Sequence, residues 1–165
     1  MSHQSKTALA STVLRSPVHF LAFGFGSGLS PIAPGTVGTL VAVLCYLFLQ
    51  SLDLQSYSLI TLAVCLAGVW ICGKSSEMLG VHDHGGIVWD EFAGYLITMI
   101  AAPPGWIWIV VGFILFRLFD IFKPWPIQWA DEHVEGGLGI MLDDILAGLA
   151  SFAVLQILAY VFYYS

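Results

Sequence analysis

The sequence has 165 residues, of which 58% are apolar and only 10% are charged, and its mean hydropathy is +0.87. Soluble domains carry about 25% charged residues, so this composition indicates a single membrane domain without a separate catalytic module. The net charge is −6, with five Lys and Arg residues in total, which excludes binding to the phosphate backbone of a nucleic acid. The three cysteines lie in apolar stretches and predict neither a disulfide framework nor a zinc site.

The N-terminal part of the chain precedes the first predicted membrane span. Residues 1–16 are too polar for a secretory signal, and we expect them to form a retained cytoplasmic tail. Residues 19–25 predict a short amphipathic or interfacial helix. A Gly/Pro/Ser-rich segment then leads into a span over about residues 36–50. Because a helix N-terminus exposes free N–H groups, we expect Thr36 to cap this span and to bind phosphate there.

Three further apolar segments predict membrane-spanning structure. Two of them, about residues 57–73 and 145–164, have the length of single spans. The third, residues 87–122, is longer than one span needs and is broken by Pro103-Pro104-Gly105. This pattern predicts a short central hairpin, either of two short spans or of a re-entrant element. The predicted fold is therefore an all-α integral membrane bundle of four to five spans, with residues 1–165 in one domain.

The charges are distributed unequally between the two sides of this bundle. With five crossings, residues 1–35, 74–91 and 117–144 share one side, which carries fifteen of the sixteen charges and all the Lys and Arg residues. The positive-inside rule makes this side cytoplasmic. The other side holds Asp53, the Pro-Pro-Gly turn and the C-terminus.

Carboxylates dominate the predicted cytoplasmic side. Asp90-Glu91 is expected to open a span, Asp120 to close one and Asp143-Asp144 to open the last. A charge at the membrane edge is costly unless it is paired or binds a metal, and oxygen ligands without a His or Cys cluster favour Mg²⁺. Acids that complement a helix dipole are the ordinary alternative for Asp90 and Asp143, but a negative charge at a helix C-terminus is disfavoured, so the alternative does not explain Asp120.

Two basic residues accompany these acids. Arg117, Asp120 and Lys123 fall at i, i+3 and i+6, roughly along one stripe of a helix that Pro124 ends. In this position Arg117 and Lys123 are suited to grip a phosphate group. The alternative is a pair of basic side chains that reach the membrane surface with Asp120 as counter-ion. His82 and His84 flank Asp83, and we expect at most one of these histidines to contribute to chemistry.

Four motifs occur in the order of a known family: G-S-G-L-S-P-I-A-P-G-T-V-G-T-L, H-D-H-G-G-I-V-W-D-E-F-A-G, F-R-L-F-D-I-F-K-P-W-P-I and G-G-L-G-I-M-L-D-D-I-L-A-G. Together they resemble bacterial phosphatidylglycerophosphatase A, from Phe23 to about Gly148. The resemblance implies a Mg²⁺-requiring phosphatase of the bacterial inner membrane that converts the phospholipid phosphatidylglycerophosphate to phosphatidylglycerol. It places the acidic family positions on Asp83, Asp90, Glu91, Asp120, Asp143 and Asp144, and the basic ones on Arg117 and Lys123.

The mechanism that we expect is metal-assisted hydrolysis of a phosphomonoester. Asp90, Glu91, Asp143 and Asp144 are the predicted metal ligands. Asp83 or Asp120 is expected to act as the base or to orient another group, so that the predicted catalytic residues are Asp83, Asp90, Asp120 and Asp144. Signatures of a covalent phosphatase intermediate are missing, which favours attack by water. The competing hypotheses are a small transporter, a non-catalytic subunit of a membrane complex and a lipid head-group transferase, whose D-x2-D-G-x2-A-R run is absent.

Overall fold

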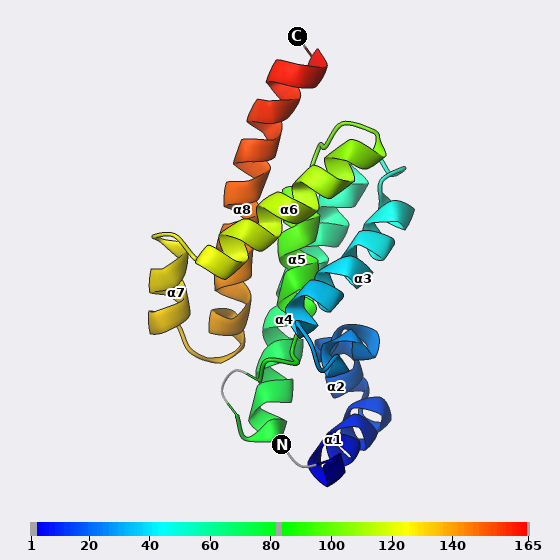
Figure 1. Ribbon diagram of the computed structural model, residues 1–165, viewed down its shortest axis with the longest axis vertical. Coiled ribbons are helices and arrows are strands. Elements are labelled where there is room, and N and C mark those ends of the chain that lie inside the picture. Colours follow the sequence, from blue (N-terminus) through cyan, green and yellow to red (C-terminus); the bar gives the residue numbers. More distant parts are fainter. Residues whose placement is uncertain (1–2, 82–83, 165) are drawn as a thin grey trace.

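The computed structural model describes residues 3–81 and 84–164, and all regular elements in these residues are helical (Figure 1). The predicted all-α class is therefore confirmed. In chain order the elements are α1 (His3–Arg15), α2 (Pro17–Ala22), the 3₁₀ helix η1 (Gly24–Leu29), α3 (Pro34–Leu49), α4 (Leu54–Leu79), α5 (Trp89–Thr98), α6 (Trp106–Phe122), α7 (Ile127–His133), α8 (Gly136–Ala159) and a terminal π-helical turn, η2 (Tyr160–Tyr164).

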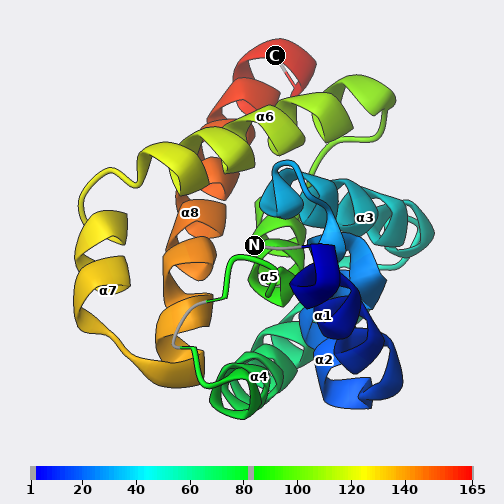
Figure 2. The ribbon, with the colours of Figure 1, turned by 60° about the horizontal axis from the view of Figure 1, so that its bottom comes forward.

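The short helix α5 lies at the centre of the bundle. Every residue from Glu91 to Thr98 is buried, and α5 contacts α3, α4, α6 and α8. Figure 2 shows these helices arranged around it. The most extensive of these contacts is with α8. The side chains of α5 are therefore held by protein on all sides, which suits a helix that positions a site.

Two glycines allow α5 and α8 to approach each other closely. A Cβ atom on Gly148 would lie 2.5 Å from the carbonyl oxygen of Gly94, and one on Gly94 would lie 2.7 Å from the carbonyl oxygen of Asp144. Such distances leave no room for a side chain. Residues four apart share one helix face, so this contact also places Asp90, one turn before Gly94, opposite Asp144, one turn before Gly148.

Two helices within the described residues are long and apolar enough to cross a membrane by length and composition: α4, and α8 with η2 over Gly136–Tyr163. The helix α3 is apolar but shorter. With 10 residues, α5 is about 15 Å long, half the thickness of a bilayer core. The predicted central hairpin is present as α5 and α6, but residues 99–105 join the two helices in a longer connection than a tight turn.

The boundaries differ from the sequence prediction at two helix starts. The last helix begins at Gly136 rather than at residue 145, because its glycines allow close packing: a Cβ atom on Gly137 would overlap the carbonyl oxygen of Val69 in α4. The cap of α3 is Ala33 in a left-handed conformation, with Pro34 at the first helical position, so the prediction that Thr36 caps this helix is wrong. Residues expected to form a tail fold into α1, whose Val13 is fully buried.

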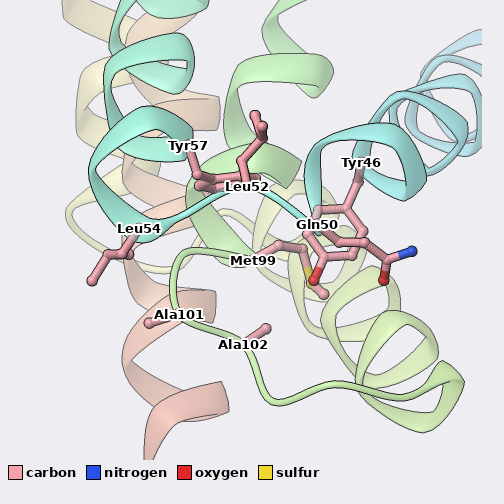
Figure 3. Close-up of a pocket in the computed structure, with 8 residues that line it drawn as sticks. All are labelled: Tyr46, Gln50, Leu52, Leu54, Tyr57, Met99, Ala101 and Ala102. Atoms are coloured by element: carbon pink, nitrogen blue, oxygen red, sulfur yellow. The ribbon is translucent and has the colours of Figure 1, made fainter.

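The turn between α3 and α4 and the connection after α5 meet at one end of the bundle. A cavity of about 150 Å³ lies there between Tyr46, Tyr57, Met99 and Ala102 (Figure 3). None of the eight lining residues is charged. Gly35 and Glu91, by contrast, lie at the opposite ends of α3 and α5. Charged residues predicted to form the site therefore lie at the end of the bundle opposite to this cavity.

Candidate active site

Three carboxylates from two helices meet at that other end. Asp90 and Glu91 of α5 and Asp144 of α8 each offer an oxygen atom, and these atoms lie within 4.8 Å of one another. Glu91 is 9% exposed and Asp144 is 3% exposed. The sequence prediction that acids of separate segments meet is thus confirmed for these three side chains.

The local structure of α5 explains where its two acids point. They occupy the first turn, where a negative charge complements the helix dipole. The Oδ1 atom of Asp90 accepts a hydrogen bond of 3.2 Å from the backbone N–H of Glu91, one of the N–H groups that the helix leaves without a partner. Asp144 is not at a helix start, as the sequence suggested, but two turns inside α8. The close contact of α5 and α8 brings it to the other two.

A guanidinium group lies beside the three carboxylates. Nη1 of Arg117 in α6 is 2.6 Å from Oδ2 of Asp120 and 3.9 Å from Oε1 of Glu91. It also donates a 3.4 Å hydrogen bond to Oγ1 of Thr39 in α3. A Cβ atom on Gly35 would overlap Glu91 and lie 3.3 Å from both terminal guanidinium nitrogens. The first turn of α3 therefore borders the site, and a side chain at position 35 would displace Glu91 and crowd Arg117.

The charges of this cluster do not balance. Asp120 and Asp90 interact electrostatically with Asp144, so four carboxylates face one guanidinium group among the residues that the structure describes. Carboxylates in a low-dielectric environment repel one another strongly. Two buried atoms, Oε2 of Glu91 and Nε of Arg117, have no hydrogen-bond partner. An excess of negative charge and unpaired polar atoms together favour a bound cation and a ligand with polar atoms.

Asp143 and Lys123 form a second cluster beside the first. Nζ of Lys123 is 2.7 Å from Oδ2 of Asp143 and 2.6 Å from Oδ1 of Asp131 in α7. Burial works to lower the pKa of Lys123, but its hydrogen bonds to both carboxylates outweigh that effect and raise the pKa above its ordinary value. Adjacent residues on a helix point in different directions, so Asp143 faces Lys123 while Asp144 faces Asp90.

The predicted residues are therefore divided between the two clusters. Asp90, Glu91, Asp120, Asp144 and Arg117 come together, whereas Asp143 and Lys123 pair with each other. Thr36 is half-buried in the first turn of α3, and Asp83, with His82, lies outside the described residues. The base–acid–base stripe predicted for α6 is broken, because the helix ends at Phe122 and Lys123 adopts a left-handed conformation.

Three residues that contact these clusters were not predicted from the sequence: Gly35, Thr39 and Asp131. Thr39 follows Gly35 by one turn on the same face of α3, a spacing that marks it as a neighbour of any group near the helix start. Asp131 lies in the acidic stretch of residues 131–135, which the sequence alone explains as a solvated loop. The sequence around Asp131 carries no signal for its contact with Lys123, because this contact depends on the packing of α7 against α8.

The comparisons with known proteins agree with this geometry. The chain matches the family "Phosphatidylglycerophosphatase A" over residues 20–159. It is 48% identical over 148 residues to Phosphatidylglycerophosphatase A of Escherichia coli strain K12, covering 89% of this chain and 86% of that protein. It is 49% identical over 148 residues to the Haemophilus influenzae protein of the same name, covering 88% and 90%.

A Bacteroides thetaiotaomicron protein whose name describes a candidate phosphatidylinositol-3-phosphatase is 38% identical over 146 residues, covering 84% of this chain and 91% of that protein. No solved structure matches this chain. An all-helical protein with these relatives and an acidic site beside an arginine is a phosphoric monoester hydrolase, which decides against the transporter, subunit and transferase hypotheses. The chain belongs to the phosphatidylglycerophosphatase A family.

Proposed function

We propose that the protein hydrolyses phosphatidylglycerophosphate to phosphatidylglycerol and inorganic phosphate, with Mg²⁺, at the cytoplasmic face of the bacterial inner membrane. The substrate is the one in the names of the two most similar relatives reported above. The observation that carries the proposal is the meeting of Asp90, Glu91 and Asp144 beside Arg117, because metal-assisted hydrolysis of a phosphomonoester needs both a cation site and a group that binds phosphate.

The donor set of the cluster fits Mg²⁺. All three side chains offer oxygen, the ligand type that this ion prefers, and Mg²⁺ typically takes one or two carboxylates together with water and substrate phosphate. The unpartnered Oε2 atom of Glu91 is one such donor. When bound there, Mg²⁺ supplies neutralisation of the phosphate oxygens and orientation of a water molecule for attack. Asp143 is the least suited of the four predicted ligands, because Lys123 occupies one of its oxygens.

Side chains of the protein bind the phosphate group and accept the proton of the attacking water. Arg117 binds the phosphate group through its terminal nitrogens, and its ion pair with Asp120 and its hydrogen bond to Thr39 fix the guanidinium plane. Asp120 also takes the proton of the attacking water, since it is the carboxylate beside the three proposed ligands. Asp83 is the other candidate base from the sequence. Lys123 contributes positive charge near the phosphate and keeps Asp143 in place.

The exterior of the bundle supports a membrane location. Large apolar side chains are exposed along three helices, namely Leu40, Leu44 and Phe48 of α3, Leu62, Leu66 and Trp70 of α4, and Ile107, Ile114 and Leu118 of α6. With α8, this surface suits four spans, and α5 completes a fifth crossing or a re-entrant element. Basic residues lie at the end that carries the site, which the positive-inside rule assigns to the cytoplasm. A lipid phosphate group lies at that depth while its acyl chains stay in the bilayer.

The test is release of inorganic phosphate from phosphatidylglycerophosphate in mixed micelles by the purified protein. We expect release that requires Mg²⁺ and that Asp144→Asn abolishes, while Glu77→Gln, at an exposed acid of α4, leaves it unchanged. Phosphatidylinositol 3-phosphate is the comparison substrate and should react more slowly. Metal-independent release, or no release by folded protein, contradicts the proposal.

A further inference from the structure

A second cavity lies at the start of α3, next to the first turn that borders the carboxylate cluster. Its volume is about 280 Å³, close to the lower end of the range of about 300–1,000 Å³ for small-ligand pockets. Three separate segments form its walls: α1, the connection from η1 to α3, and the segment before α5. The lining residues are Leu9 and Ala10, Gly28 to Pro31 with Pro34, and His84 to Gly86.

One wall of this cavity is one residue away from the groups that border the carboxylate cluster. Pro34 lines it, and the next residue, Gly35, is in contact with Glu91 and Arg117. In the proposed function, a phosphate group held by Arg117 would therefore lie near the side of the cavity that Pro34 forms. The rest of a substrate attached to that phosphate can then extend into the cavity.

The floor of the cavity is built from backbone in close contact. A Cβ atom on Gly28 would overlap the carbonyl oxygen of Gly86, so the two segments fit together only as glycines. The N–H of Gly86 donates a 3.1 Å hydrogen bond to Nδ1 of His84. The ring of His84 also packs against Phe23, with 5.4 Å between ring centroids. His84 is therefore held in place before any ligand binds.

These contacts decide which atoms of the cavity are available to a ligand. Because Nδ1 of His84 accepts a hydrogen bond, the neutral ring carries its proton on Nε2. The other lining residue with a polar side chain, Ser30, already donates to the carbonyl oxygen of Ile32 at 2.8 Å. No Lys or Arg is among the described lining residues. Among the lining residues that the structure describes, His84 is thus the one whose side chain offers a donor, Nε2–H, to a ligand.

We propose that this cavity binds the glycerol and phosphodiester part of the lipid head group, and that His84 donates a hydrogen bond from Nε2 to it. The inference rests on the proposed function, in which the terminal phosphate lies at Arg117. One neutral donor suits a diester, which carries a single negative charge, better than a second monoester. The apolar wall from Leu9 and Ala10 of α1 suits the carbon atoms of the glycerol unit. His84 is a specificity-determining residue in this arrangement, not a proton carrier.

The test compares His84→Asn with His84→Gln. Asparagine places an oxygen near the position of Nδ1 and preserves the bond from Gly86, whereas glutamine places an N–H near the position of Nε2. We expect His84→Asn and His84→Ala to raise KM for phosphatidylglycerophosphate about tenfold with little change in kcat, and His84→Gln to restore most of the loss. His133→Asn, at an exposed histidine of α7, is the matched control.

A second substrate separates this inference from the proposed function. Phosphatidic acid carries the same phosphomonoester without the glycerol and phosphodiester, so we expect a lower kcat/KM that His84→Asn does not change further. Recovery of normal KM by asparagine, or equal losses on both lipids, overturns the role of His84. Absence of phosphate release from either lipid by the unsubstituted protein overturns the proposed function itself.

Discussion

Arg117 and Asp120, one turn apart on α6, form an ion pair of 2.6 Å in which each side chain is only 14% exposed. Oxygens of a phosphate group suit the forked donors of arginine better than the point charge of lysine. We expect Arg117→Lys to lower kcat/KM about 30- to 150-fold, the equivalent of about 2–3 kcal/mol. Phosphate release against substrate concentration measures this. Lys74→Gln breaks an exposed pair of the same spacing, with Glu77, and should leave activity unchanged.

Asp120→Asn tests the proposed base. Asparagine still offers an oxygen to Arg117 but cannot take a proton at neutral pH. We therefore expect kcat to fall by about 10²- to 10⁴-fold, with KM little changed, in steady-state assays at saturating Mg²⁺. A kcat near that of the unsubstituted protein would show that Asp120 is not the base and would leave Asp83 as the candidate.

Removal of Mg²⁺ should destabilise the fold. The carboxylates of Asp90, Glu91, Asp120 and Asp144 face a single guanidinium, so a cation relieves their repulsion. At about 100 times its Kd, a ligand stabilises the folded state by about 2.7 kcal/mol. We expect the thermal unfolding midpoint in detergent, followed by tryptophan fluorescence, to rise with Mg²⁺ and to fall with chelator.

The same measurement on Asp144→Asn provides a sharper outcome. Removal of one repelling charge should make this variant more stable than the unsubstituted protein in chelator, and Mg²⁺ should no longer raise its midpoint. Glu77→Gln should keep the full response to Mg²⁺. A response in Asp144→Asn equal to that of the unsubstituted protein would place the cation elsewhere.

Lys123 is expected to matter for stability as well as for substrate binding. Lys123→Met leaves Asp143 without its partner and should cost about 1–3 kcal/mol of unfolding free energy, less than for a fully buried pair because the lysine side chain is 27% exposed. The double variant with Asp143→Asn should lose less than the sum of the two single variants. If the loss of unfolding free energy in the double variant equalled the sum of the two single losses, Lys123 and Asp143 would not be coupled.

The raised pKa of Lys123 also predicts a pH dependence. A group with a higher pKa in the folded state adds stability that is complete below the pKa of an unfolded lysine, about 10.4. This stability is lost as the pH rises through the higher folded value. Unfolding midpoints measured from pH 8 to 11 should therefore fall less steeply in Lys123→Met. Parallel pH profiles for the two proteins would show that Lys123 does not contribute.

The contact between Gly94 and Gly148 should set the geometry of the site. Gly148→Ala forces α5 and α8 apart, and overpacking of this kind typically costs about 1–3 kcal/mol. We expect a lower unfolding midpoint and a weaker apparent affinity for Mg²⁺, because Asp144 moves away from Asp90. Leu149→Ala, at an exposed position next to it on α8, should leave the Mg²⁺ affinity unchanged.

Much of the fold follows from the sequence because apolar runs and proline-glycine breaks are local signals. The helix α3 and the hairpin of α5 and α6 fall close to their predicted ranges, whereas α4 runs six residues beyond its predicted end at residue 73. The start of α8 was missed because glycines before Asp143 suggest a loop, whereas here they serve close packing against α4. That use depends on contacts between distant segments, which no local pattern reveals.

The candidate site shows the same limit. The sequence places acids at the predicted cytoplasmic ends, and three of them do meet. Which acid faces which partner depends on helix rotation and on the end of α6, so the pairing of Asp143 with Lys123 rather than with Asp144's cluster was not predictable. Thr39 and Gly35 were missed because their roles arise only when α3 packs beside α5 and α6.

Because α5 is buried on every side, we expect homologues to differ in length outside this helix rather than within it. One inserted residue rotates all later positions of a helix by about 100°, which would turn Gly94 away from α8 and move larger side chains into its place. Leu40, Leu44 and Phe48 of α3 are exposed on the outside of the bundle. In the proposed membrane location their neighbours would be fluid acyl chains, so this side of α3 should tolerate such a rotation better. Insertions and deletions should therefore accumulate in the turn at residues 50–53 and in residues 99–105, and α5 should keep its length.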